Sequence, residues 1–199
     1  LCALSNGART DAVRPADRPA HLSDAGMTIL RTTDRHGEIW CRCDGGPHGF
    51  LSIAAHAHAD ALSVEVRHDG VDILADPGTY CYHGQPAWRA YFRSTIGHNT
   101  LELDGRDQSQ SGGPFLWTRH ARTTVLVADG SKWSAEHDGY SRGRGPAAHR
   151  RTVHLDRERR EVTLHDEVRT PSTRDCRLAF HLGPEVTAVL DGHEAVLSW

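Results

Sequence analysis

The sequence has no apolar run long enough to cross a bilayer. Hydrophobic residues make up 38% of its 199 residues, and none of their runs approaches the roughly 18 consecutive residues that a membrane-spanning helix requires. It also lacks an excess of positive charge, because 23 Lys and Arg residues stand against 26 Asp and Glu residues and give a formal net charge of −3. Such a chain has no overall positive field to hold a nucleic acid. We therefore expect neither a membrane span nor a nucleic-acid partner.

A cysteine framework is absent too. The five cysteines are odd in number and none has CxxC spacing, so they indicate neither a set of disulfides nor a cysteine-type zinc ribbon. Cys41 and Cys43 lie two residues apart, on one face of a strand, where a small buried hydrophobic side chain is their ordinary role. The chain begins with Leu1 rather than Met, and no signal peptide opens it. We expect a piece of a longer protein, and any secretion signal would lie outside this sequence.

Sustained helical periodicity is the last missing feature, since no stretch keeps a 3.6-residue period for more than about two turns. Residues 1–25 carry prolines and charges without a clear period, which predicts a linker or an extended lead-in. From Met27 onward, short β-forming runs alternate with turn residues. This pattern predicts one all-β domain over residues 26–199, an antiparallel β-sandwich. The last expected strand stops at Trp199, so a truncation on the C-terminal side is part of the prediction.

The expected strands are 27–33 with 38–43 across a turn at 34–37, 62–67 with 71–75, 98–103, 121–127 with 133–137, 152–155 with 161–165, 177–182, 186–190 and 195–199. Two segments between strands, 77–97 and 106–117, are expected to be long irregular loops. They contain seven Tyr, Trp and Phe side chains, a composition that disorder does not favour. Long ordered loops in a compact β domain are usually functional, so the site is expected there.

Histidine is the unusual residue, with 15 copies. His56, His58 and Asp60 alternate with alanines, so in extended backbone all three side chains face one way. Asp76 ends a hairpin strand that folds back beside this segment, and His98 opens the next alternating strand. Two histidines and one carboxylate at the ends of neighbouring strands suit Zn²⁺ with one open position.

Other interpretations of these histidines remain open. Iron(II) also binds two histidines and a carboxylate, and His58-Ala59-Asp60 matches the His-x-Asp spacing of iron oxygenases, with His98 or a later histidine as the distal ligand. Alternatively, the histidines only cap strands and bond to backbone.

A local positive surface is predicted around the first long loop. Arg89 and Arg93 lie four residues apart with Tyr91 between them, and arginine forks bind carboxylates and sulfates through two contacts. Between residues 83 and 122, five arginines stand against three acids, a balance of +2 in an acidic chain. This favours an anionic substrate, and Arg89 and Arg93 are the predicted substrate-binding residues. The structural alternative is that these arginines pair with the neighbouring acids.

Five short motifs follow one another between Phe50 and Trp117: His-Ala-His-Ala-Asp-Ala-Leu-Ser (56–63), Leu-Ala-Asp-Pro-Gly-Thr-Tyr (74–80), Tyr-Phe-Arg-Ser (91–94), His-Asn-Thr (98–100) and Asp-Gly-Arg-Asp-Gln-Ser (104–109). In this order and spacing they resemble the heparinase II/III-like family, which includes heparin, heparan sulfate and alginate lyases. The resemblance implies a supersandwich-type β domain that follows a helical (α/α) toroid in the complete enzyme. The toroid is the expected partner domain, and this chain is expected to be a fragment without it.

The resemblance also implies roles for individual residues. Zinc would be bound by His58, Asp76 and His98, and would order the active-site loop rather than contact the substrate. His56 would face the substrate. A loop tyrosine would join it, and two residues qualify for this catalytic role, Tyr82 and Tyr91.

The implied reaction is β-elimination at a uronic acid of an anionic polysaccharide. A base removes the C5 proton, the carboxylate is neutralised, and an acid protonates the departing oxygen. Tyrosine serves as base only where positive neighbours or hydrogen bonds favour its phenolate. Because the principal catalytic tyrosine of the family belongs to the toroid, we expect this chain to be inactive alone. The alternative function is an inactive carbohydrate-binding or structural β module. The resemblance favours a periplasmic, envelope or secreted location.

Overall fold

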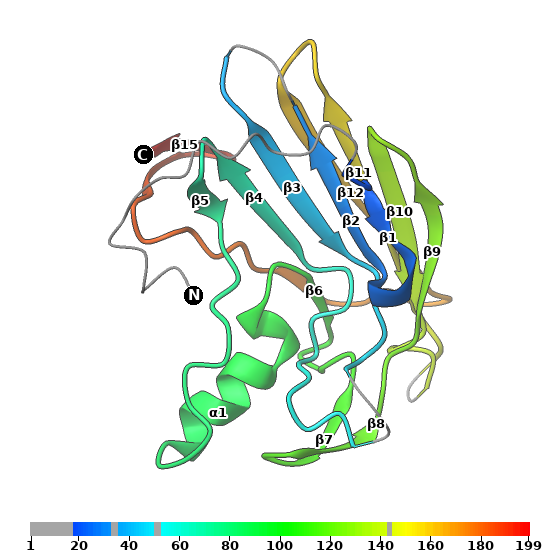
Figure 1. Ribbon diagram of the computed structural model, residues 1–199. Coiled ribbons are helices and arrows are strands. Elements are labelled where there is room, and N and C mark those ends of the chain that lie inside the picture. The colour runs from blue at the N-terminus through cyan, green and yellow to red at the C-terminus, as the bar shows by residue number, and fades with distance from the viewer. Residues whose placement is uncertain (1–17, 33–35, 50–52, 143–144) are drawn as a thin grey trace.

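A computed structural model describes residues 18–32, 36–49, 53–142 and 145–199 (Figure 1). The chain forms two antiparallel sheets packed face to face. The first sheet has the order β1-β2-β3-β4-β5 and consists of β1 (His21–Leu22), β2 (Met27–Arg31), β3 (Ile39–Asp44), β4 (Val64–His68) and β5 (Val71–Leu74). The second has the order β12-β11-β10-β9 and consists of β9 (Thr123–Ala128), β10 (Lys132–His137), β11 (Ala148–Asp156) and β12 (Glu161–Arg169).

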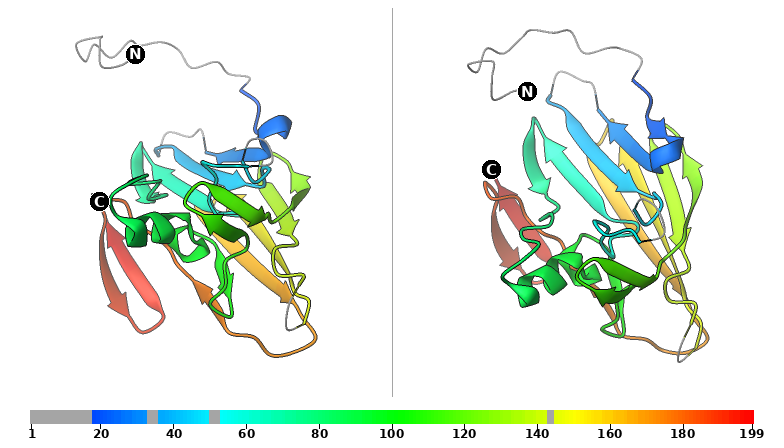
Figure 2. Two further views of the ribbon diagram at one scale, coloured as in Figure 1. Left: turned by 90° about the horizontal axis from the view of Figure 1, so that it is seen from below. Right: turned by 60° about the horizontal axis from the view of Figure 1, so that its bottom comes forward.

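Smaller elements surround the sandwich. Three two-stranded sheets pair β6 (Leu101–Leu103) with β13 (Cys176–Leu178), β7 (Gln110–Gly113) with β8 (Leu116–Arg119), and β14 (Thr187–Asp191) with β15 (Glu194–Ser198). The helical elements are α1 (Pro86–Arg93) and the 3₁₀ turns η2 (Ser23–Ala25) and η3 (Thr95–Gly97). Figure 2 shows α1 and the β7–β8 hairpin gathered at one end of the sandwich. Among the described residues no helix is both long and apolar enough to span a bilayer.

The core lies between the two sheets because each inner face follows the period-two alternation of a half-buried strand. In β3, for example, Ile39, Cys41 and Cys43 are buried while the residues between them are partly exposed. They pack with Trp133 and Val153 of the second sheet in one cluster of buried residues. Cys41 and Cys43 are free and buried, which confirms the interpretation of these two cysteines as core residues.

The expected antiparallel β-sandwich is therefore confirmed, and the hairpins around β2–β3, β4–β5, β9–β10 and β11–β12 form as predicted. The turn at 34–37 lies in part outside the described residues, as do residues 1–17 of the predicted linker; residues 21–22 pair with β2. The first long loop differs from its prediction because residues 86–93 form helix α1. Pro86 at its first position is the local reason, because its fixed φ suits the start of a helix.

A buried polar network joins the second sheet to the rest of the molecule. Arg151 on β11 is fully buried; its Nε lies 2.7 Å and its Nη2 3.0 Å from the Asp166 carboxylate. Its Nη1 donates to the carbonyl oxygens of Leu62 at 2.9 Å and Asn99 at 2.6 Å. Burial alone would raise the pKa of Asp166, but hydrogen bonds from His149 and Arg151 hold it at about 2.

Two histidines extend this network. The backbone N–H of Gly139 donates to His137 Nδ1 at 3.0 Å, His137 Nε2 lies 3.2 Å from His149 Nδ1, and His149 Nε2 lies 2.7 Å from Asp166. Each ring can therefore be neutral, with one nitrogen donating and the other accepting. Burial lowers the pKa of both histidines, that of His137 well below its ordinary value.

We expect Arg151→Met to lower the free energy of unfolding by about 3–5 kcal/mol, because it leaves the largely buried Asp166 carboxylate without its main partner. Urea unfolding followed by circular dichroism measures the change. Arg159→Met is the matched control, since the Arg159 side chain is 75% exposed, and its effect should stay within about 0.5 kcal/mol. Equal midpoints for the two variants would contradict the role given to the network.

A pH dependence follows from the histidine pair. Their folded pKa values lie below the unfolded value near 6.5, so the unfolded chain binds more protons in acid. The free energy of unfolding should be fully retained above about pH 6.5 and fall below it, by up to about 1.4 kcal/mol per pH unit for each histidine. His137→Gln should show a shallower slope between pH 6.5 and 5 in urea titrations. Parallel curves for variant and wild type would show that the pair is not responsible.

Candidate metal centre and substrate cleft

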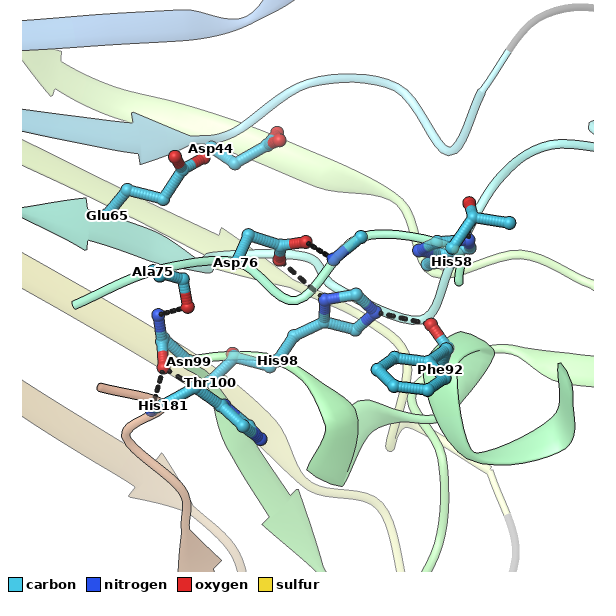
Figure 3. A network of polar contacts seen from close by, with 12 residues as sticks. Asp44, His58, Glu65, Ala75, Asp76, Phe92, His98, Asn99, Thr100 and His181 are labelled. Carbon is cyan, nitrogen blue, oxygen red and sulfur yellow. Dashed lines mark hydrogen bonds and ion pairs between the residues drawn. The ribbon is translucent and has the colours of Figure 1, made fainter. Parts of the chain in front are cut away.

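His98 is the centre of the candidate metal site. It is fully buried, its Nδ1 lies 2.6 Å from Asp76 Oδ2 and its Nε2 lies 3.1 Å from the carbonyl oxygen of Phe92 (Figure 3). Asp76 also accepts a hydrogen bond from the backbone N–H of Gly78 at 2.8 Å. Burial alone would lower the pKa of His98, but the bond to Asp76 and the charges of Asp60 and Asp76 raise it above its ordinary value. Two acceptors thus fix the ring's orientation.

His58 stacks on His98, with ring centroids 5.0 Å apart and planes 29° apart. Its Nε2 lies 3.1 Å from Thr79 Oγ1, and its side chain is 8% exposed. Burial, followed by repulsion from His98, lowers the pKa of His58 to about 4. The ring is therefore neutral at pH 7 and offers the lone pair that a metal requires.

Two carboxylates flank these histidines. The ligand atoms of His58, Asp60 and His98 all lie within 4.8 Å of one another, whereas Asp76, the carboxylate predicted from the sequence, bonds directly to His98. Burial raises the pKa of Asp60 to about 7. Burial would also raise the pKa of Asp76, but the hydrogen bond from His98 lowers it below its ordinary value. Asp76 is therefore the carboxylate that is more readily charged at neutral pH.

The donor set fits a divalent transition metal. Neutral imidazole and carboxylate are the donors that Zn²⁺ takes at about 2.0–2.2 Å, and tetrahedral ligands at that distance lie about 3.3 Å from one another. Asp76 and His98 would need to separate only slightly from 2.6 Å to share an ion. The assignment of His58, Asp76 and His98 as ligands remains a prediction, with Asp60 as a competing carboxylate.

A cavity of about 440 Å³ is lined by Tyr82, Arg89 and Phe115 among others. The phenol of Tyr82 lies 3.3 Å from Nδ1 of His56, and the guanidinium of Arg89 lies 5.0 Å from the centre of the Tyr82 ring. Both His56 and Tyr82 are exposed. Two residues predicted to face the substrate are therefore brought into contact, with the Arg89 guanidinium next to the Tyr82 ring. His56 itself lines a separate hollow of about 170 Å³ together with His58.

Tyr91 lies elsewhere. It is on α1, and its phenol oxygen is 3.3 Å from Nε2 of His181, on the segment that runs beside β5. Tyr91 is not among the residues that line the 440 Å³ cavity. Of the two tyrosines that the sequence left open, Tyr82 is the one within hydrogen-bond distance of His56.

Arg89 and Arg93 line the same cavity but are each only 3% exposed. Arg89 donates to the carbonyl oxygen of Pro114 at 3.0 Å, and Arg93 donates to that of Gly113 at 2.6 Å. Among the described residues neither forms an ion pair with an acid, so the pairing considered as their alternative role is not seen. They hold the β7–β8 hairpin against α1, and two of their nitrogens, Arg89 Nη1 and Arg93 Nε, have no partner.

One local expectation was wrong. Residues 56–60 do not form a strand with all three side chains on one face, because Ala57 N–H bonds to the Ala54 carbonyl at 2.9 Å and Ala54 has a positive φ of 46°. The segment is a series of turns. As a result His56 points to Tyr82 while His58 points to His98.

Asn99 was not identified from the sequence. Its side-chain amide donates to the carbonyl oxygens of Val64 at 2.9 Å and Ala75 at 3.0 Å, and its oxygen accepts from the backbone N–H of His181 at 2.6 Å (Figure 3). It thus holds β4, the end of β5 and a distant segment beside His98. Its place directly after His98 in the His-Asn-Thr motif was the available signal.

Comparison with known proteins identifies the fold family. The sequence profile described as "Heparinase II/III-like, C-terminal" matches residues 14–199. The chain belongs to the heparinase II/III-like family. This confirms the resemblance seen in the motifs. A sequence comparison with curated proteins gives no significant match.

Solved structures with the same fold include a heparinase III gene product (19% identity, TM-score 0.69, 90% of this chain and 26% of that chain). A heparan sulfate lyase mutant from Pedobacter heparinus is similar (19% identity, TM-score 0.68, 89% and 26%), as is a further heparinase III (22% identity, TM-score 0.64, 84% and 25%). The heparinase II/III-like chain described here thus spans about a quarter of the length of these proteins.

We expect the heparinase II/III-like chain, purified without a metal-binding tag, to carry close to one zinc ion, measured by plasma mass spectrometry. His98→Ala should lose it, because the variant removes a predicted ligand that also holds Asp76 in place. His154→Ala is the matched control, since His154 is exposed on β11. A chain without stoichiometric metal would show that these donors do not bind an ion.

The same measurement separates the two carboxylates. Asp76→Asn should lower zinc affinity by at least 10-fold in a competition with a fluorescent chelator, a size typical of lost ligands and their close partners. Asp60→Asn tests the competing carboxylate. If Asp60→Asn lost the metal while Asp76→Asn kept it, the ligand set would be His58, Asp60 and His98.

Proposed function

We propose that this chain is the β-sandwich half of a polysaccharide lyase that cleaves a uronic-acid-containing anionic polysaccharide by β-elimination. The observation that carries the proposal is the pairing of His56 with Tyr82 at 3.3 Å, where Tyr82 lines a cavity of about 440 Å³ and His56 lines a hollow together with His58 of the His-Asp centre. Family membership supports it. The complete enzyme would add a helical toroid, and a periplasmic, envelope or secreted location would suit a polymeric substrate.

The chemistry follows from what His56 and Tyr82 can do together. β-Elimination needs one group to take the C5 proton and another to protonate the leaving oxygen. The phenol and the imidazole are in hydrogen-bond reach, so a proton can pass between Tyr82 Oη and His56 Nδ1. The guanidinium of Arg89 lies 5.0 Å from the centre of the Tyr82 ring, so a fixed positive charge stands next to this pair.

The metal centre has a structural role in this proposal. A bound zinc ion would supply a fixed link between the loop at His58, the end of β5 at Asp76 and the segment before β6 at His98. With these three segments linked, the side chains of His58, Asp76 and His98 would fix the backbone around the His56–Tyr82 pair. His58 is two residues from His56, and Ala59 N–H bonds to the Arg93 carbonyl at 2.9 Å, so an ordered His58 orders both the His56 side and the α1 side of the opening.

Turnover in the full-length protein tests the proposal. Formation of an unsaturated uronate is followed by ultraviolet absorbance. We expect His56→Ala and Tyr82→Phe to lower kcat by about 100-fold or more, the usual contribution of general acid–base groups. Tyr80→Phe is the control. Tyr80 is 64% exposed, and the substitution removes only a phenolic hydroxyl, as Tyr82→Phe does. The isolated chain should show no turnover.

Other results would change the assignment. A larger loss for Tyr91→Phe than for Tyr82→Phe would place the catalytic tyrosine beside His181 instead. Saccharide binding without any turnover in the full-length protein would support the alternative, an inactive carbohydrate-binding module.

A further inference from the structure

A second hollow, of about 460 Å³, lies next to strand β8 and the segment that follows β10. Its charged lining residues are Arg119, Arg122, Arg142 and Asp138, so three positive groups face one negative group in a chain whose net charge is −3. The lining is mainly polar, with His120 beside the arginines. Such a concentration of one charge sign in a hollow attracts anions.

The positive groups of this hollow are available to a ligand. Arg122 and Arg142 are exposed, and no hydrogen bond or ion pair joins their guanidinium groups to another described residue. The Asp138 carboxylate accepts instead from the backbone N–H of Arg122 at 2.8 Å. Arg119 uses one nitrogen on the carbonyl oxygen of Gly139, which fixes its side chain while its other donors remain. The hollow therefore differs from the Tyr82 cavity, whose arginines are buried against carbonyl groups.

This hollow is the last of three neighbouring hollows that share lining residues. It shares His120 and Arg122 with a neighbouring hollow of about 690 Å³. That one in turn shares His48 with a hollow of about 170 Å³ lined by His56 and His58. Three hollows that share lining residues thus lead from His56 to the arginines, and we call this series the trough.

His48 marks the middle of this trough. Its Nδ1 lies 3.2 Å from Ser109 Oγ, and its Nε2 is buried without a hydrogen-bond partner. The positive end of the trough is at Arg119, Arg122 and Arg142, several side chains away from the reacting pair. One sugar bound at His56 and Tyr82 does not extend along this series of hollows, but a polymer can.

We propose that the arginine hollow is a remote subsite that binds carboxylate or sulfate groups of the same polysaccharide, several sugars from the bond that is cleaved. This inference rests on the proposed function, because it takes the His56–Tyr82 opening as the place where the polymer is cut. It adds a specificity determinant: substrates long enough to fill both places bind more tightly than short ones.

The test is direct binding, which needs no turnover. Isothermal titration of the purified chain uses a heparan sulfate dodecasaccharide, a tetrasaccharide of the same series, an oligogalacturonate and a neutral maltodextrin. We expect the dodecasaccharide to bind more tightly than the tetrasaccharide, the maltodextrin not to bind, and the affinity to fall as salt increases. The oligogalacturonate separates carboxylate recognition from sulfate recognition.

Variants locate the contact. Arg122→Gln should weaken dodecasaccharide binding about fivefold and the Arg119→Gln/Arg122→Gln pair about 20-fold, the scale of partly exposed ion pairs. Tetrasaccharide binding should change less. Arg159→Gln is the matched control, because Arg159 lies in the turn between β11 and β12, at the opposite end of the sandwich (Figure 1). Thermal unfolding verifies that each variant is folded.

Several outcomes would overturn the proposal. Unchanged dodecasaccharide affinity in the double variant, equal losses for long and short ligands, or equally strong maltodextrin binding would each do so. An acidic domain of the full-length protein that requires Arg122 for docking and blocks the dodecasaccharide would also overturn it. Length-dependent binding in a full-length protein without turnover would instead refute the lyase proposal and leave the subsite intact.

Discussion

The buried guanidinium of Arg151 is the interaction on which the site depends. It connects a carboxylate on β12 with the carbonyl oxygens of Leu62 and Asn99, the first just beyond the His-rich loop and the second next to His98. One planar group thereby fixes the distance between the second sheet and both ligand-bearing segments. A lysine has only one nitrogen and could not make all these contacts together.

Elsewhere in the site, polar side chains mostly form hydrogen bonds with backbone groups rather than with one another. Asn99 binds two carbonyl oxygens and one N–H group, and Arg89 and Arg93 bind carbonyl oxygens of the β7–β8 hairpin. Irregular segments leave such groups without ladder partners, and buried backbone groups must be satisfied. The polar residues of the long loops therefore serve first to make the loops possible, and this leaves His56, His58 and Tyr82 in defined places.

The sequence predicted the sandwich well because its strands alternate in hydrophobicity and are separated by clear turn residues. The sequence also predicted that His58, Asp76 and His98 lie in one region, since hairpin connectivity limits where strand ends can lie. The sequence did not predict helix α1. Its eight residues make only about two helical turns, and their mixed aromatic and charged side chains show no clear 3.6-residue period. The prediction failed again at residues 56–60, where a positive φ at Ala54 redirects the chain and no glycine signals it. The bridging role of His181, 90 residues from Tyr91, depends on tertiary contacts that no local pattern encodes.

The turn that separates His56 from His58 has a mechanical consequence. Only Ala57 lies between a residue of the substrate opening and a residue of the buried centre, and Trp117 Nε1 donates to the Ala57 carbonyl oxygen at 3.2 Å. The backbone between the two histidines is thus held at Ala57 by an indole. His56 and His58 therefore take their positions from the same short backbone segment, so the arrangement of the buried centre and that of the His56–Tyr82 pair are set together.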